Sequence, residues 1–207
     1  MLRMSIIAAQ SELDAVNSML ATIGEMPVST LEGGLHADAI IALDTLRQVS
    51  REVQQIGWYF NIERNYDLPP DLDGHINLPD NFISVDIEPR STLTPQDVAT
   101  RGNRLYNMGD HTYVFDDTLT ATITVLLPFE ELPETAKSYV TVRASRLFLS
   151  RVVGSETLQQ FTRQDEATTF AALKREQVRK TDRNFLSPHR KSRMGIYSTA
   201  RILDRRI

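Results

Sequence analysis

A strictly alternating segment in the middle of the chain constrains the fold more than any other part of the sequence. Over residues 118–127, apolar side chains occupy every second position and threonines most of the positions between them. This alternation predicts a strand with one buried and one exposed face. The apolar set is Leu119, Ala121, Ile123, Val125 and Leu127. Because parallel strands are usually covered on both faces, a strand of this kind indicates an antiparallel sheet.

Four segments with helical periodicity surround this strand. In each of them apolar residues recur at steps of three and four, so that one face of the helix is apolar. The predicted helices cover residues 11–23, 36–56, 134–153 and 156–180. The apolar stripe of the last helix is the weakest, and it consists of Leu158, Phe161, Thr168 and Ala172.

The ends of the first two helices carry recognisable signals. Ser11 is suited to cap the first helix, with the carboxylate of Asp14 three residues later. Gly24 can end that helix in the left-handed conformation, and Gly57 is a natural stop for the second. Three residues near the second stop are expected in the core: Leu46, Val53 and Trp58.

The β structure is predicted between residues 58 and 127. An aromatic-rich strand is expected over 58–62, and another strand over 82–87. Residues 104–108 and 111–115 flank Gly109-Asp110, a two-residue hairpin signal. Together these elements predict an α+β fold, in which a bundle of about four helices carries an inserted antiparallel β-sheet.

An uneven charge distribution separates the end of the chain from the rest. The net charge of the 207 residues is −4, but residues 174–207 hold 11 basic and 3 acidic residues. The preceding part therefore holds 12 basic and 24 acidic residues. The composition changes after Asp182, so we expect a single α+β domain over 1–181 and an extended basic arm over 182–207. Such an arm can lie on an acidic neighbour, bind nucleic acid, or remain solvated.

No arrangement of residues predicts a metal or cofactor site. The four histidines, at positions 36, 75, 111 and 189, have no metal-site spacing, and no His-Glu-x-x-His motif occurs. Asp71, Asp73 and Asp80 crowd a turn-rich loop but lack the other ligands of a calcium loop, so Asx turns are the favoured interpretation. The absence of cysteine excludes disulfides and thiolate metal sites. No apolar run is long enough to span a membrane, and no signal peptide is expected.

Two further groups of side chains allow a chemical interpretation. Glu130, Glu131 and Glu134 could supply the carboxylate pair of a glycoside hydrolase. The same residues suit a helix N-terminus, where negative charge interacts favourably with the helix dipole, and this interpretation is favoured. The aromatic run 58–60 could stack on a sugar or a base but is expected to be core. We therefore expect no catalytic activity.

Two runs in the first third of the chain resemble a known family. One covers residues 23–33, with the sequence IGEMPVSTLEG, and the other covers residues 57–61, with the sequence GWYFN. Their joint pattern is similar to the amino-terminal third of the tail tubular protein A family of short-tailed bacteriophages. The resemblance is best over residues 10–63, continues more loosely through 130–148, and is poor over 64–128 and in the tail.

The resemblance implies a structural virion protein. Such a protein is made in the host cytoplasm and forms a ring, dodecameric in the family, that acts as the adaptor of the virion tail. It docks on the portal protein above and receives the nozzle-forming tubular protein B below. Viral DNA passes through the lumen without sequence-specific binding, and no membrane is involved.

The basic arm is the predicted portal-docking segment. It has too few apolar residues to fold alone, so it must gain order from a partner. The residues expected to contact the portal are Arg190, Lys191, Arg193, Ile196, Tyr197, Arg201, Ile202 and Leu203. Two other functions remain open at this point: a glycan-hydrolysing or glycan-binding tail protein, and a nucleic-acid-binding protein that uses the basic tail.

Overall fold

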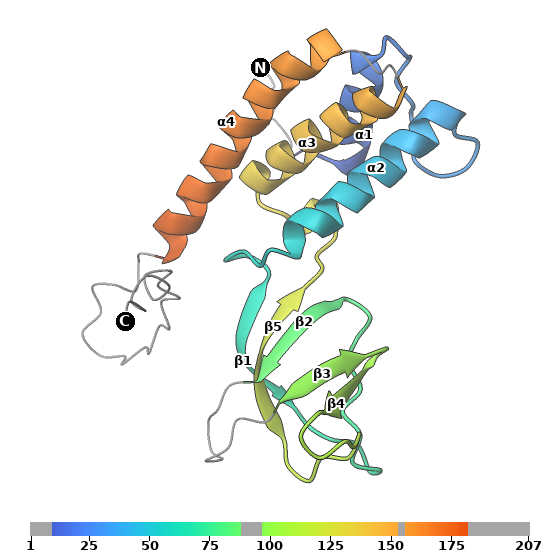
Figure 1. Cartoon of the computed structure of the whole chain (residues 1–207). Helices are drawn as coiled ribbons and strands as arrows, with labels where there is room; N and C mark the ends of the chain where they lie inside the picture. Colours follow the sequence, from blue (N-terminus) through green and yellow to red (C-terminus); the bar gives the residue numbers. More distant parts are fainter. Residues whose placement is uncertain (1–9, 88–96, 153–155, 182–207) are drawn as a thin grey trace, which may run out of the picture.

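A helical region and a β region, joined by a narrow neck, make up the molecule (Figure 1). The computed structural model describes residues 10–87, 97–152 and 156–181. The helices are α1 (Glu12–Thr22), α2 (Ala37–Gln54), α3 (Glu134–Val152) and α4 (Glu156–Thr181), and the short 3-10 helix η1 (Phe129–Glu131) precedes α3. The β region lies between α2 and α3 in sequence and is therefore an insertion in the helical bundle. The predicted α+β fold with four helices and an inserted antiparallel sheet is confirmed.

The β region contains two small antiparallel sheets. The strands β1 (Ile62–Leu68), β5 (Leu119–Val125) and β2 (Phe82–Ile87) lie side by side in that order. The strands β3 (Val98–Arg101) and β4 (Arg104–Asn107) form a separate hairpin. The alternation predicted for the central strand is confirmed, because all four apolar residues of β5 are buried: Leu119, Ala121, Ile123 and Val125.

The strand predicted over 58–62 is wrong, because β1 begins only at Ile62. Residues 58–61 form a turn instead. The Asn61 side chain accepts a hydrogen bond from the backbone N–H of Trp58 at 2.8 Å, and the backbone N–H of Asn61 donates to the Trp58 carbonyl at 3.1 Å. This local pairing closes the chain on itself and competes with extension.

The hairpin predicted for 104–108 with 111–115 is reduced to a single antiparallel bridge, in which the backbones of Asn107 and Thr112 exchange hydrogen bonds at 2.8 and 3.2 Å. The strand β4 pairs with β3 through a turn at Gly102, whose φ is +63°. Residues 111–115 contribute only isolated bridges, such as the one from Thr112 to Asn107. The Asn107 side chain accepts hydrogen bonds from the backbone N–H groups of Gly109 and Asp110, at 2.9 and 3.1 Å, so the chain forms a tight local turn there.

The core of the helical region surrounds α3, which packs against α1, α2 and α4. Leu46, Val53 and Trp58 are buried, as predicted. The stripe predicted for α4 is wrong at Thr168, whereas Ala172 is partly buried, and the side chains of Leu158 and Phe161 lie outside the described ones. Thr168 is exposed, whereas Leu173 is fully buried and Phe170 packs against the core. Among the described residues no helix has the length and apolar character needed to cross a membrane.

The start of α1 follows its sequence signal. The Ser11 hydroxyl accepts from the backbone N–H of Asp14 at 3.1 Å, and the Asp14 carboxylate accepts from the backbone N–H of Ser11 at 3.0 Å. This reciprocal capping box satisfies two N–H groups that the helix cannot. The hydrogen bonds from Ser11 lower the pKa of the Asp14 carboxyl. At the other end, Gly24 takes the predicted left-handed conformation, with φ of +80°.

Candidate functional site

The neck between the two regions is clamped by two buried side-chain amides. Gln54, at the end of α2, accepts from the backbone N–H of Leu127 at 2.8 Å and donates to the carbonyl of Leu127 at 3.0 Å. Asn61 donates to the carbonyls of Gln54 and Val125, both at 3.0 Å. Both side chains are buried, so these hydrogen bonds are shielded from water. The two chain segments that form the neck, one around Asn61 and one over 125–127, are therefore both hydrogen-bonded to the end of α2 or to each other.

The aromatic run 58–60 serves this junction. Trp58 is buried and donates its indole N–H to the Val53 carbonyl at 2.7 Å. Its ring packs edge-on against Phe170 of α4, with the ring centroids 6.3 Å apart, and parallel to Phe60 at 6.5 Å. The expectation that Trp58 belongs to the core is confirmed.

The C-terminal half of α4 is fastened to the same turn. The backbone N–H of Tyr59 donates to the Gln177 side chain at 2.8 Å, and the Tyr59 hydroxyl donates to Glu176 at 2.6 Å. The hydroxyl of Thr135 donates to the other oxygen of Glu176. These bonds from Thr135 and Tyr59 lower the pKa of Glu176, and burial, then the contact with Glu176, raises the pKa of Tyr59. The carboxylate of Glu176 therefore links α4 to both α3 and the neck.

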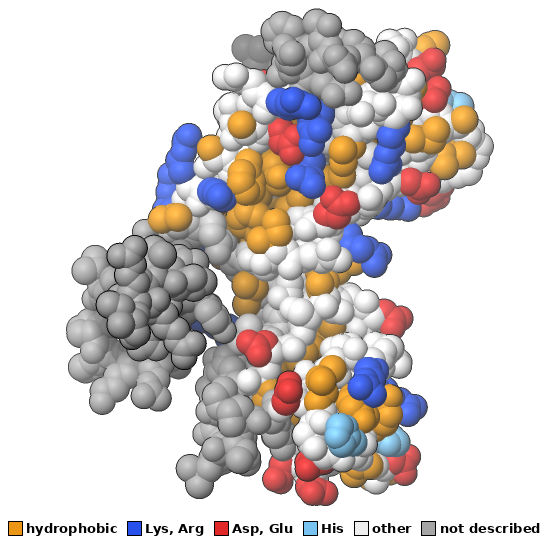
Figure 2. Space-filling view, in the orientation of Figure 1, with side chains coloured by type: hydrophobic (Ala, Val, Ile, Leu, Met, Phe, Trp, Pro, Cys, Tyr) orange, Lys and Arg blue, Asp and Glu red, His pale blue; other side chains and the backbone are white. Residues whose placement is uncertain are grey.

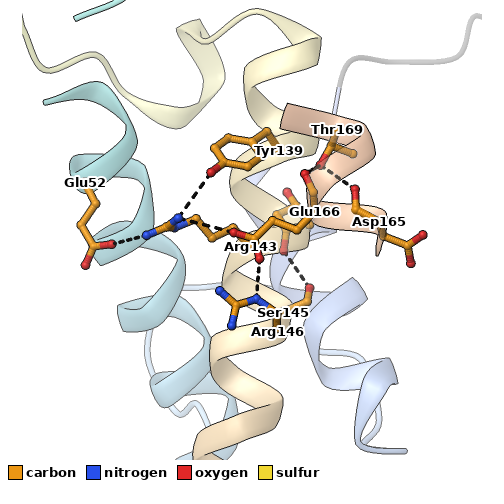
Figure 3. A network of polar contacts seen from close by, with 9 residues as sticks. Glu52, Tyr139, Arg143, Ser145, Arg146, Asp165, Glu166 and Thr169 are labelled. Carbon is orange, nitrogen blue, oxygen red and sulfur yellow. Dashed lines mark hydrogen bonds and ion pairs between the residues drawn. The ribbon is translucent and has the colours of Figure 1, made fainter. Parts of the chain in front are cut away.

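An ion-pair network joins the other half of α4 to α3 and α2 (Figure 3). Arg143 of α3 lies 3.4 Å from Glu166 of α4 and 3.3 Å from Glu52 of α2. Arg146 pairs with the second oxygen of Glu166, and Tyr139 lies 3.4 Å from Arg143. The network fixes the positions of three helices. On the face of the helical region seen in Figure 2, apolar side chains gather in the middle, and cations and carboxylates border them.

The glutamates predicted at the start of the third helix lie in and around η1. Glu134 stands in the first turn of α3 and pairs with Lys137 at 3.1 Å, consistent with the favoured helix-terminus interpretation. Glu130 and Glu131 belong to η1 and are exposed. The oxygen of Glu130 lies 3.4 Å from the backbone nitrogen of Glu12, so η1 contacts the start of α1.

A shallow surface hollow opens beside Glu130, with a volume of about 410 Å³. We call it the acidic hollow. Its lining residues come from α1, the following loop, α2 and η1: Ser11, Glu12, Leu13, Ser29, Thr30, Leu31, Glu32, Arg47 and Glu130. Asn17 holds the loop in place, because its side chain exchanges two hydrogen bonds with the backbone of Val28, at 2.8 and 3.0 Å.

The acidic hollow carries a net negative charge. Its one lining cation, Arg47, makes a two-pronged ion pair with Glu12, at 2.9 and 3.1 Å, and this pairing raises the pKa of Arg47. Within the part of the chain that the structure describes, no ion pair joins Glu32 or Glu130 to a cation. Glu130 accepts from the backbone N–H of Glu12 and acts on Arg47 through its charge, and both carboxylates can still receive an external positive group.

The aspartates of the β region form a turn. The Asp71 carboxylate accepts from the backbone N–H groups of Asp73 and His75, at 3.0 and 2.8 Å, and from the Asn77 side chain at 2.8 Å. The hydrogen bonds from His75 and Asp73 lower the pKa of Asp71. Asp71, Asp73 and His75 bring ligand-type atoms within 4.8 Å of one another. This geometry fits the Asx turn that the sequence predicted and gives no separate sign of an ion.

The residues predicted to dock on the portal lie outside the described residues. All eight belong to the segment 182–207: Arg190, Lys191, Arg193, Ile196, Tyr197, Arg201, Ile202 and Leu203. Their part in docking stays a prediction. His189 also lies in this segment, whereas His36 caps α2 by accepting from the backbone N–H of Ala39 at 3.4 Å.

Comparison with known proteins places this architecture in a family. Residues 13–183 match the family described as Tail tubular protein. This match spans all four helices and the whole β region. The chain belongs to the tail tubular protein family. It is therefore a structural component of a phage virion tail, as the resemblance implied.

A relative within this group is the tail tubular protein A of Klebsiella phage KP34. The two sequences are 26% identical over 156 residues, which cover 75% of this chain and 81% of the relative. The aligned length is greater than the helical region alone, so the similarity extends into the inserted β region.

Sequence reasoning missed the residues that join the parts of this tail tubular protein. Gln54 was included only as part of the helix predicted over 36–56, and Asn61 as part of the strand predicted over 58–62. The one available signal was the unbroken sequence from Gln54 to Asn61, in which two amides flank a glycine and an aromatic run. Such a signal does not reveal the partner of Gln54, Leu127, which lies 73 residues away.

Proposed function

We propose that this tail tubular protein forms a homo-oligomeric ring that connects the portal to the lower tail nozzle. The observation that carries the proposal is the family match over residues 13–183. The relative's name, tail tubular protein A, supports the adaptor position that the sequence resemblance implied. In this proposal the rings, dodecameric by family resemblance, line part of the channel through which viral DNA passes.

The shape of the subunit supports this role. A closed ring needs a heterologous interface, in which one face of a subunit meets a different face of the next. A subunit with two regions and a clamped neck can present one region to each neighbouring layer of the tail (Figure 1). The excess of acidic residues before position 174 disfavours binding of DNA phosphates, which suits a channel that DNA must leave.

The portal is the proposed partner of the basic arm. Residues 182–207 contain 7 Lys and Arg against 2 Asp, and they follow directly on the basic end of α4. Arginines of the arm would pair with acidic groups of the portal, while Ile196, Tyr197, Ile202 and Leu203 would bury apolar surface. Because exposed charge pairs are screened by salt, attachment should weaken as ionic strength rises.

Native mass measurement of the protein mixed with its portal tests the proposal directly. We expect a complex with one defined number of adaptor subunits, and we expect deletion of 182–207 to abolish the complex while the circular dichroism spectrum keeps its helical signal. A control deletion of the exposed loop tip at Leu72 and Asp73 should leave attachment intact. Equal attachment of the arm-deleted protein would exclude the arm as the docking segment.

Absence of hydrolytic activity is a separate part of the proposal. The purified protein is expected to release no reducing sugar from bacterial polysaccharide. A release that disappears in Glu130→Gln or Glu134→Gln would instead establish the glycan-hydrolase alternative. DNA retention that is lost with residues 182–207 and with rising salt would favour the nucleic-acid-binding alternative.

A further inference from the structure

The outer face of α4 carries exposed side chains that form no ion pair within the described part of the subunit. The helix packs against α3 through Leu173 and Phe170, and against the neck through Glu176. Val178 and Arg179 lie three and four residues after Arg175, so both are its neighbours on the helix surface. All three are exposed, and Val178 keeps 54% of its surface accessible. This surface presents two cations beside one exposed apolar side chain.

The acidic hollow has the complementary character. Glu32 and Glu130 stand at its edge, and neither pairs with a cation among the described residues. Leu13 and Leu31 are half-buried and supply an apolar part of the lining. A volume of about 410 Å³ admits the ends of a few side chains and is too small for a folded segment.

The two surfaces lie on different sides of the helical region. The residues that line the hollow belong to α1, the following loop, α2 and η1. The helix α4 packs against α3, which separates it from α1. In Figure 1, α4 forms one edge of the bundle and α1 lies beyond α3. A subunit cannot therefore fill its own hollow with its own α4 face. A contact between two copies joins the α4 face of one to the hollow of the other, and it leaves one surface of each kind free for a further copy.

We propose that the α4 face of one copy docks in the acidic hollow of the next copy. Val178 contacts the apolar lining of the hollow, and Arg175 and Arg179 pair with Glu32 and Glu130. This inference rests on the proposed self-assembly and identifies its interface. It uses no residue of the arm, so the contact between copies and the attachment to the portal can fail separately.

Paired charge reversal tests the interface. One variant is R175E/R179E, which makes the α4 face acidic, and the other is E32R/E130R, which makes the hollow basic. The control is R64E/R104E, which reverses two exposed arginines in the β region. Sedimentation velocity at low salt measures the association of each protein, and circular dichroism verifies that each variant is folded.

Each reversal alone should raise the dissociation constant at least tenfold, because like charges then face each other. The control should associate as the unmodified chain does. An equimolar mixture of the two reversal variants should recover association, since the acidic α4 face fits the basic hollow and the unmodified α4 face fits the unmodified hollow. The mixed assembly should alternate strictly between the two variants, which native mass spectrometry resolves.

The interface is wrong if both reversal variants associate like the control, or if their mixture fails to recover association. If the unmodified chain assembles only on the portal, the unmodified chain, the two reversal variants, their mixture and the control are compared as complexes with the portal. A defined ring that ignores the reversals would reject the interface and leave the adaptor function intact. A chain that never self-associates, alone or with the portal, would reject both the ring and the interface.

Discussion

The helical region and the β region of this chain are stabilised to different degrees. Among the described residues, the core of the helical region contains nineteen buried apolar residues, against nine in the β region. In the helical region α3 has neighbours on several sides, whereas among the described strands of the β region only β5 is flanked on both sides. Large apolar side chains at the far end of the β region are exposed: Leu72, Met108, Tyr113 and Val114. The comparison indicates that the helical region can fold alone and that the β region depends on one strand.

The largest effect is expected from a charge in that strand. Ile123 is fully buried in β5, so Ile123→Asp places an unpaired carboxylate in the smaller core. We expect a loss of more than about 4 kcal/mol, enough to unfold the β region. Hydrogen exchange should show lost protection in residues 62–125 and retained protection in α2 and α3. The exposed change Ser84→Asp, in the neighbouring strand β2, should have little effect. Loss of protection in all helices would show that the two regions unfold as one unit.

A cavity made in the core of the helical region should lower the stability of both regions. Leu46 is fully buried in α2, and Leu46→Ala should cost about 3 kcal/mol. Because α2 and α3 carry the two ends of the insertion, both regions should melt together at a lower temperature. Ile40→Ala, at a position of the same helix with 47% exposure, is the matched control. Separate melting of the two regions in L46A would contradict the dependence of the β region on the helices.

A smaller change is expected at the neck. Gln54→Leu leaves the backbone N–H and carbonyl of Leu127 without their partner, which should cost about 2 kcal/mol. The two regions should also move more freely relative to each other. Since the chain has no cysteine, spin labels can be placed at introduced cysteines replacing Asp44 and Ser84. The distance distribution should broaden in Q54L and stay narrow in the exposed control Gln55→Leu. An unchanged distribution would mean that packing alone fixes the neck.

The smallest effect is expected when the pH is lowered, because protonation of Glu176 weakens the attachment of α4. Since the folded-state pKa of Glu176 is lowered by its bonds to Thr135 and Tyr59, its ionised form stabilises the folded state. This contribution is fully present above the ordinary glutamate value of 4.5 and is lost as the pH falls through the lower folded pKa. Trp58 contacts Phe170 of α4, so its fluorescence should report the loosening of α4 in that range. Glu176→Gln should remove this step, and Glu63→Gln in the β region should keep it. A step that persists in E176Q would assign it to another carboxyl.

Sequence patterns predicted the features that depend on neighbours in the chain. Helical periodicity placed the four helices, the capping signal at Ser11 was correct, and strict alternation identified β5 and its buried face. The α4 stripe was wrong because the helix has few apolar residues, and tertiary packing selected Phe170 and Leu173 rather than Thr168.

Features that join distant segments could not be predicted in this way. The pairing of β4 with β3, and its contact with 111–115 through the bridge to Thr112, could not be read from the Gly109-Asp110 signal. The hydrogen bond between Gln54 and Leu127 joins residues that are 73 positions apart. The hydrogen bond between Tyr59 and Glu176 joins residues that are 117 positions apart. The acidic hollow combines four separate segments, so its charges were visible in the sequence but their proximity was not.

The clamped neck has a consequence for how such tails diversify. At the base of the insertion, Ile62 is paired with Thr124 across an antiparallel ladder, so the two ends of the β region lie about 5 Å apart. Any domain whose own termini are that close could replace residues 63–123 without changing the helices. The insertion is therefore the part of the protein that evolution, or an engineer, can exchange most readily.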